Sequence, residues 1–210
     1  MSRYAKLTTG LLGLWFVFSL AAGARHLYQN AANQPPLNLG LAVGLPIILF
    51  VVWFAASKTF RVFTLSLNPR TLTMVQGWRF AGIAFVALAA YGILPNLFAA
   101  AAGYGDIFIG LTAFLVALNL VSAEHRGSFI VWQLLGIVDL VNAVLLGTVS
   151  GIINPHGIPT TAMTELPMSL IPTFGVPLFF ILHVICIAQA LRWPKRQVAA
   201  VREPLRSASF

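Results

Sequence analysis

The 210-residue chain is 59% hydrophobic and only 9% charged, with 13 basic and 5 acidic residues. About a quarter of the residues in a typical soluble domain are charged, and disordered chains combine high charge with few apolar residues. The composition therefore excludes both classes and indicates an integral membrane protein. The single cysteine excludes a disulfide within the chain, a four-cysteine zinc site and a cysteine-ligated iron–sulfur cluster.

Six stretches are long and apolar enough to cross a bilayer, which takes about 20 mostly apolar residues. They run approximately over Leu7–Ala24, Leu37–Ser57, Thr73–Leu94, Ile107–Ser122, Phe129–Ser150 and Met168–Leu191. Each stretch is continuously apolar, whereas the strands of a membrane barrel alternate between apolar and polar residues. The sequence therefore predicts an all-α integral membrane bundle of six transmembrane helices. Residues 1–191 are expected to form one domain, followed by a short basic tail over residues 192–210.

The first predicted span has a second interpretation. Arg3 and Lys6 precede an apolar run that ends in Ala22-Gly23-Ala24, and this pattern also resembles a secretory signal peptide. The apolar run is about 18 residues long, which exceeds the roughly 7–15 residues of a signal peptide's apolar region. The length favours a retained helix, and cleavage would leave five spans with the same orientation.

The basic residues fall on one side of the predicted spans. Eleven of the 13 lie in the N-terminal segment, in two connections on the same side and in the C-terminal tail, whereas Arg25 alone lies on the other side. The positive-inside rule then predicts that both termini are cytoplasmic. The basic inner face is expected to attract anionic lipid. Topology accounts for the net charge of +8, so no nucleic-acid partner is expected.

The third predicted span contains Gln76 and Arg79 on one side of the helix. Arg79 lies six residues, or about 9 Å, inside the span from its basic end. One interpretation is that the arginine snorkels to the headgroups, with its charge in the interface. The other is an ion pair with Asp139 of the fifth span.

Before the fourth predicted span, Gly103-Tyr104-Gly105-Asp106 predicts a turn in which Asp106 caps the helix N-terminus. This span is the shortest of the six. The small-residue run over 98–102 would allow it to begin earlier.

Asp139 lies ten residues into the fifth predicted span, about 15 Å deep and near the bilayer midplane. A carboxylate at that depth costs about 2.5–3.5 kcal/mol on insertion scales, so it is expected to face the bundle interior, to be paired or to be protonated. Asn142 shares its helix face, and Gly136 permits the close approach of a neighbouring helix. The heights of Asp139 and Arg79 differ by roughly 6 Å, which an arginine side chain can bridge.

His183 lies in the last predicted span, eight residues or about 12 Å from its cytoplasmic end. A hydrogen bond between helices, a proton relay and a metal or haem ligand remain open for it. No second histidine lies at a comparable depth, so no cofactor is predicted and haem at His183 stays an alternative. Pro172 and Pro177 remove backbone donors in this span, and Ser169 and Thr173 are placed to satisfy the freed carbonyls.

Three phrases resemble those of uncharacterised bacterial multi-spanning membrane proteins with no assigned activity: Gln76-Gly77-Trp78-Arg79, Gly105-Asp106-Ile107-Phe108-Ile109-Gly110 and Leu166-Pro167-Met168-Ser169-Leu170-Ile171-Pro172-Thr173-Phe174. The resemblance implies a multi-pass protein of the bacterial inner membrane, and it transfers no catalytic or binding residue.

Three classes of function remain open, and no catalytic motif indicates an enzyme. The first is a small-solute permease or proton-linked carrier whose polar core comprises Gln76, Arg79, Asp139, Asn142 and His183. The second is a non-catalytic membrane subunit or assembly factor whose buried polar residues determine helix packing. The third is a membrane redox or cofactor-binding protein. The sequence does not distinguish a small-molecule substrate from a protein partner.

Overall fold

The computed structural model describes residues 3–29, 36–154 and 156–194, and every regular element in these ranges is a helix. The elements are α1 (Arg3–Ala24), α2 (Leu37–Ala56), α3 (Lys58–Leu65), α4 (Pro69–Val75), η1 (Gln76–Gly82), α5 (Ile83–Ala90), α6 (Asn96–Asn119), α7 (Arg126–Ile153), η2 (Thr161–Thr164), η3 (Ile171–Gly175) and α8 (Val176–Ala190). The predicted basic tail lies outside the described residues from residue 195 onward.

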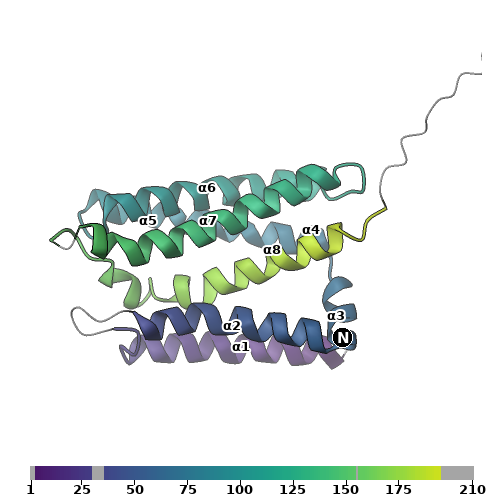
Figure 1. Ribbon diagram of the computed structural model, residues 1–210, viewed down its shortest axis with the longest axis horizontal. Coiled ribbons are helices and arrows are strands. Elements are labelled where there is room, and N and C mark those ends of the chain that lie inside the picture. Colours follow the sequence, from purple (N-terminus) through teal and green to yellow (C-terminus); the bar gives the residue numbers. More distant parts are fainter. Residues whose placement is uncertain (1–2, 30–35, 155, 195–210) are drawn as a thin grey trace, which may run out of the picture.

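Six helical segments of the described chain are long and apolar enough to cross a membrane, which confirms the predicted number. The third of them is continuous over Pro69–Ala90 and comprises α4, η1 and α5. The helices run side by side, and α8 lies between the pair α1–α2 and the pair α6–α7 (Figure 1). The core joins α6, α7 and α8 through Ile109, Ala113, Phe129, Trp132 and Cys186.

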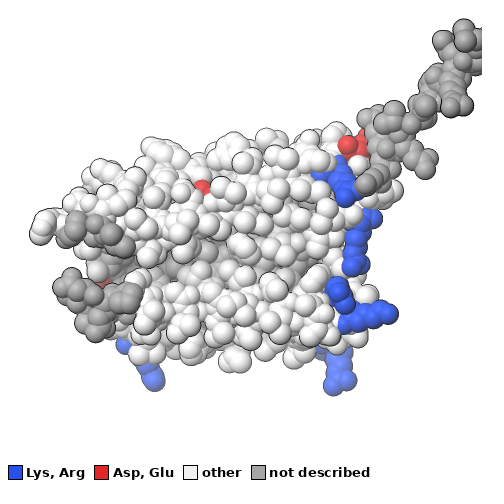
Figure 2. Space-filling model, viewed as in Figure 1, with Lys and Arg blue, Asp and Glu red and all other residues white. Residues whose placement is uncertain are grey.

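Between the two ends of the bundle, the face drawn in Figure 2 shows no Lys or Arg and only a small acidic patch. Many large apolar side chains of the described residues are exposed. No residue of α2 is buried, although this helix is apolar on all sides. A helix of this kind is stable in water only inside a large core, whereas a bilayer solvates it directly. The exposed apolar surface is therefore the surface expected of a membrane protein.

Lys and Arg side chains gather at one end of the bundle (Figure 2). Tyr4 of α1 stacks on Phe63 of α3 at that end, with 5.9 Å between the ring centroids. Arg126 at the start of α7 donates a hydrogen bond to the carbonyl of Trp193, beyond α8. The helix termini at this end are therefore held together by direct contacts.

Helix α6 corrects one prediction, because it begins at Asn96 and continues through the segment expected to form a turn. Gly103 lies inside this helix, where a Cβ atom would stand 2.7 Å from Cγ2 of Val86. The glycines thus allow α6 to pack closely against the third span, as small residues do in membrane helices. Asp106 is consequently an interior residue of the helix and does not cap it.

Helix α8 follows a π-helical segment, η3, which contacts α1 through a carbonyl that a proline leaves free. Pro177 has no N–H to donate to the carbonyl of Thr173. That carbonyl accepts instead from Trp15 Nε1 at 3.1 Å and from Ser19 Oγ at 3.5 Å, both on α1. The predicted role of Ser169 is not observed, because its hydroxyl has no hydrogen-bond partner among the described residues.

Candidate functional site

The third span positions Arg79 by an unusual local geometry. Its central segment η1 is a 3-10 helix of seven residues, and its buried residues are Gln76, Arg79 and Gly82. A 3-10 helix has three residues per turn, so residues at this spacing lie in one line along the helix. The line begins with the buried Thr73 of α4 and faces the bundle interior. Arg79 therefore points inward from the middle of an apolar span.

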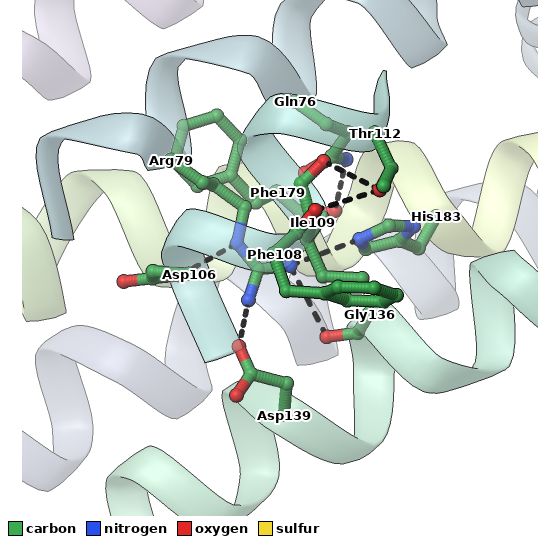
Figure 3. Close-up of polar contacts among 10 residues, drawn as sticks. All are labelled: Gln76, Arg79, Asp106, Phe108, Ile109, Thr112, Gly136, Asp139, Phe179 and His183. Carbon is green, nitrogen blue, oxygen red and sulfur yellow. Dashed lines mark hydrogen bonds and ion pairs between the residues drawn. The ribbon is translucent and has the colours of Figure 1, made fainter. Parts of the chain in front are cut away.

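Arg79 is 2% exposed and donates hydrogen bonds to three other helices (Figure 3). Its Nε donates to Oδ1 of Asp106 on α6 at 2.6 Å, and its Nη2 donates to Oδ2 of Asp139 on α7. Its Nη1 lies 3.3 Å from both the carbonyl oxygen of Gly136 and Nε2 of His183. The predicted ion pair with Asp139 is confirmed, and the snorkelling interpretation is wrong because the side chain turns into the bundle.

Asp106 is one of two site residues that could not be recognised from the sequence, because its glycine-rich context resembled a turn. It lies ten residues into α6, which is about 15 Å along the helix. An acidic residue between two apolar stretches was the available signal, since charges are rare at such depths. We refer to Arg79, Asp106, Asp139 and His183 as the Arg79 cluster.

The hydrogen bonds around His183 determine its tautomer. A guanidinium only donates, so Nε2 of His183 accepts from Arg79 and the ring proton resides on Nδ1. Nδ1 then donates to Oε1 of Gln133, whose Nε2 donates to Oγ1 of Thr73 at 3.3 Å. The Thr73 hydroxyl donates in turn to the carbonyl of Pro69 at 2.8 Å. In this arrangement His183 is neutral, and its hydrogen bonds connect α8 to α7 and η1.

Gln133 also escaped the sequence analysis, although its spacing gave a signal. Gln133, Gly136 and Asp139 recur every three residues on α7, and each contributes to the contacts around Arg79 or His183. A fully buried amide in a membrane helix needs a partner, as Gln133 finds in His183.

Two glycines make room for these contacts on α6 and α7. A Cβ atom at Gly105 would stand 1.7 Å from Oδ1 of Asp139. A Cβ atom at Gly136 would stand 2.2 Å from Nε2 of His183. Distances this short mean that any larger residue would displace the carboxylate or the imidazole.

Two further glycines bring α6 against η1. A Cβ atom at Gly82 would stand 2.4 Å from Cβ of Asp106, and one at Gly110 would stand 2.4 Å from the backbone nitrogen of Phe80. The backbones of α6 and η1 therefore approach closely on both sides of Arg79, as small residues permit in membrane helices.

Two residues of the predicted polar core lie outside the Arg79 cluster. Asn142 is exposed, because a step of three residues from Asp139 turns 60° around the helix, and Asp139 already lies at the edge of the buried face. Gln76 is buried, and its Nε2 donates to the carbonyl of Phe179 at 3.1 Å. Its Oε1 has no hydrogen-bond partner within the described ranges.

The charges of the Arg79 cluster do not balance when both carboxyls are ionised. One guanidinium faces two carboxylates, and His183 is neutral in the observed hydrogen-bond arrangement. The cluster then carries one negative charge. The side chains of both aspartates are 14% exposed. A buried net charge is costly, and one added proton would make the cluster neutral.

The haem alternative does not fit the geometry of His183. Both ring nitrogens make hydrogen bonds, and the backbone of Gly136 lies directly against Nε2. Neither nitrogen is free to bind iron without breaking these contacts. Within residues 3–29, 36–154 and 156–194, no group of three or more His, Cys, Asp or Glu side chains is placed to hold a metal ion.

Two hollows lie away from the Arg79 cluster. The larger, about 560 Å³, is an apolar groove on the outer side of the third span, lined by residues that include Met74, Trp78, Phe80 and Phe114. The smaller, about 230 Å³, lies beside the C-terminal end of α8 and includes Gln189. Neither hollow is lined by a residue of the Arg79 cluster.

Comparison with known proteins supports the resemblance to an uncharacterised family. The model of a protein family described as a domain of unknown function (DUF8737) matches residues 36–191. The matched range contains α2 through α8 and the whole Arg79 cluster. No curated protein and no solved structure matches the chain.

Proposed function

The chain belongs to the DUF8737 family of unknown function, and from that premise we propose that it is a proton-linked carrier of a small solute. The Arg79 cluster is its proton-binding core. The protein is proposed to reside in a bacterial inner membrane with both termini in the cytoplasm. Its basic end then faces the cytoplasm and contacts anionic lipid.

One observation supports this proposal above the others: a single buried guanidinium lies between two carboxyls in the middle of three apolar spans. Such a cluster holds one exchangeable proton, because only the protonated form is neutral. Protonation of Asp139 removes its attraction for Nη2 of Arg79 and weakens one link between η1 and α7. Proton uptake thereby changes how the helices are held together, which is the requirement for coupling.

The proposed proton site is tested by infrared difference spectroscopy of the purified protein in lipid. Wild type, Asp139→Asn and Asp106→Asn are compared across a pH titration. We expect a carboxyl stretch that appears in wild type on acidification and disappears in one of the two variants. A spectrum without any titrating carboxyl inside the spans would contradict the proposal.

Coupling to a solute is tested in proteoliposomes that contain the pH-sensitive dye pyranine. Pulses of amino acids, carboxylates, sugars and organic cations are applied outside, and the internal pH is followed. We expect at least one class to change the internal pH with wild type and not with Asp139→Asn. The control is Asn142→Leu, which alters an exposed residue of the same helix and should retain the response.

A second candidate function is a membrane subunit or assembly factor with no transport activity. The observation in its favour is that Arg79 uses both terminal nitrogens and Nε in bonds to α6, α7 and α8, which determines one helix packing. Under this function, no solute changes the internal pH. A stable partner protein should instead copurify with wild type and be lost when the cluster is neutralised.

The proposed orientation is tested by cysteine labelling in a Cys186→Ala background. Ser66→Cys lies at the basic end of the bundle, and His156→Cys follows α7 at the other end. In intact cells we expect a membrane-impermeant maleimide to label position 156 and not position 66. Labelling of both positions from the same side would overturn the topology.

A further inference from the structure

The central segment of the third span is the feature that the proposed proton site does not explain. Runs of 3-10 helix longer than three or four residues are uncommon, and a stretch in mid-helix often marks a hinge. Segment η1 has seven residues and lies between two α-helical segments of one span. It also carries Arg79, the central residue of the cluster.

The contacts of η1 explain why it takes this form. Three residues of an α-helix turn through 300°, whereas three residues of a 3-10 helix complete one turn. An α-helical version of the segment would therefore turn Gly82 about 120° away from the line of Gln76. Gly82 could then no longer lie against Asp106, where its missing side chain permits a close approach. Arg79 would likewise turn about 60° from Gln76 and away from its carboxylate partners.

We propose that η1 is a conformational switch that the ion pairs of Arg79 hold in the 3-10 form. Uptake of the single exchangeable proton by one of the two carboxyls removes one of these ion pairs, and the segment then rewinds to an α-helix. Rewinding seven residues shortens the span by about 3.5 Å and rotates α5 relative to α4 by about 140°. The inference rests on the same cluster as the proposed function, although it does not require any transported solute.

The groups that can drive the switch come from every helix packed on Arg79. Asp106 lies on α6, Asp139 on α7 and His183 on α8. Cys186 lies one turn beyond His183, where its Sγ is 3.9 Å from Oγ1 of Thr73 and does not contact Arg79. The two carboxyls are the groups whose charge holds the guanidinium, so protonation of one of them is the expected trigger.

The switch is tested by distance measurements between pairs of nitroxide labels in a Cys186→Ala background. The reporting pair is Arg70→Cys and Tyr91→Cys, which are exposed positions on either side of η1. The control pair is Leu97→Cys and Leu118→Cys, which are exposed, lie in the uninterrupted helix α6 and have the same sequence separation. Both pairs are measured by pulsed electron paramagnetic resonance in lipid.

The decisive variant replaces the whole charged set by neutral side chains, Arg79→Gln with Asp106→Asn and Asp139→Asn. It leaves no unpaired charge in the core, so it is expected to fold. The reporting pair should be about 3 Å closer in this variant than in the protein with native Arg79, Asp106 and Asp139. The control pair should not change.

Acidification of the labelled protein with the native cluster gives a second measurement, which does not depend on the folding of a variant. The reporting distance should shorten as the cluster takes up its proton, and the control distance should stay constant. An unchanged reporting distance in both experiments would overturn the switch. If the distance shortens but no solute moves protons, the switch stands and the carrier function is wrong. If solutes change the internal pH but the reporting distance between the two labels stays constant, the carrier function stands without the switch.

Discussion

Asp139 can reach Arg79 because residue 105 on the neighbouring helix is a glycine. A Cβ atom at Gly105 would occupy the position of the Asp139 carboxylate, 1.7 Å from Oδ1. The ion pair thus requires glycine at position 105 as well as the two charged side chains. This relationship connects the packing of α6 and α7 to the chemistry of the site.

Gly105→Ala is therefore expected to destabilise the protein by about 1–3 kcal/mol, the usual effect of overpacking a filled interior. The measurement is the free energy of unfolding in detergent micelles, followed by circular dichroism. The matched control is Gly40→Ala on α2, where an added Cβ meets no atom within 4 Å. That control should be neutral or stabilising by up to about 1 kcal/mol, because alanine favours a helix. Equal effects of the two substitutions would contradict the close contact.

Substitutions of the two aspartates are expected to have non-additive effects on the free energy of unfolding. Asp106→Asn or Asp139→Asn alone leaves Arg79 with one carboxylate and a balanced charge, so each should cost less than about 1.5 kcal/mol. The double variant leaves the buried guanidinium without any carboxylate, which should cost about 3–5 kcal/mol. A double-mutant cycle on unfolding free energies checks this. If the double variant lost only the sum of the two single changes in unfolding free energy, the two carboxyls would not share Arg79.

Gln133→Leu is expected to cost about 1–3 kcal/mol, because it leaves Nδ1–H of His183 buried without an acceptor. The loss of that acceptor should also change the tautomer balance of His183, which is visible in its ¹⁵N chemical shifts. Asn142→Leu on the same helix changes an exposed residue and should stay within about 0.5 kcal/mol. If the ¹⁵N shifts of His183 do not respond to Gln133→Leu, the assigned tautomer is wrong.

Helix α1 is expected to remain part of the mature protein, because Trp15 and Ser19 satisfy the carbonyl that Pro177 leaves free. Intact mass spectrometry of the protein from membranes should therefore include residues 1–24. Trp15→Phe removes one donor and should lower the melting temperature. Trp78→Phe, at a side chain that is 77% exposed, should not. A mature chain that begins at Arg25 would show that the first helix is a cleaved signal.

Much of the helical architecture could be predicted from the sequence by itself. The six apolar stretches and the basic residues at one end can be counted along the chain, because hydrocarbon excludes charge from each span separately. Arg79, Asp139 and His183 were recognised for the same reason, and their similar heights follow from the rise of a helix. The structure brings these three residues together.

The partners of these residues were decided only by the tertiary structure. Height along a span is set by sequence position, but the direction of a side chain depends on the rotation of its helix and on which helix lies beside it. Apolar helices such as α2 have no distinct inner face in their sequence. Their sequences therefore indicate neither the rotation of the helix nor its neighbours. Rotation placed Asn142 outside the cluster, and close glycine contacts brought Asp106 into it. The 3-10 form of η1 aligned Arg79 with the interior, because its bonds to three other helices exist only in the assembled bundle.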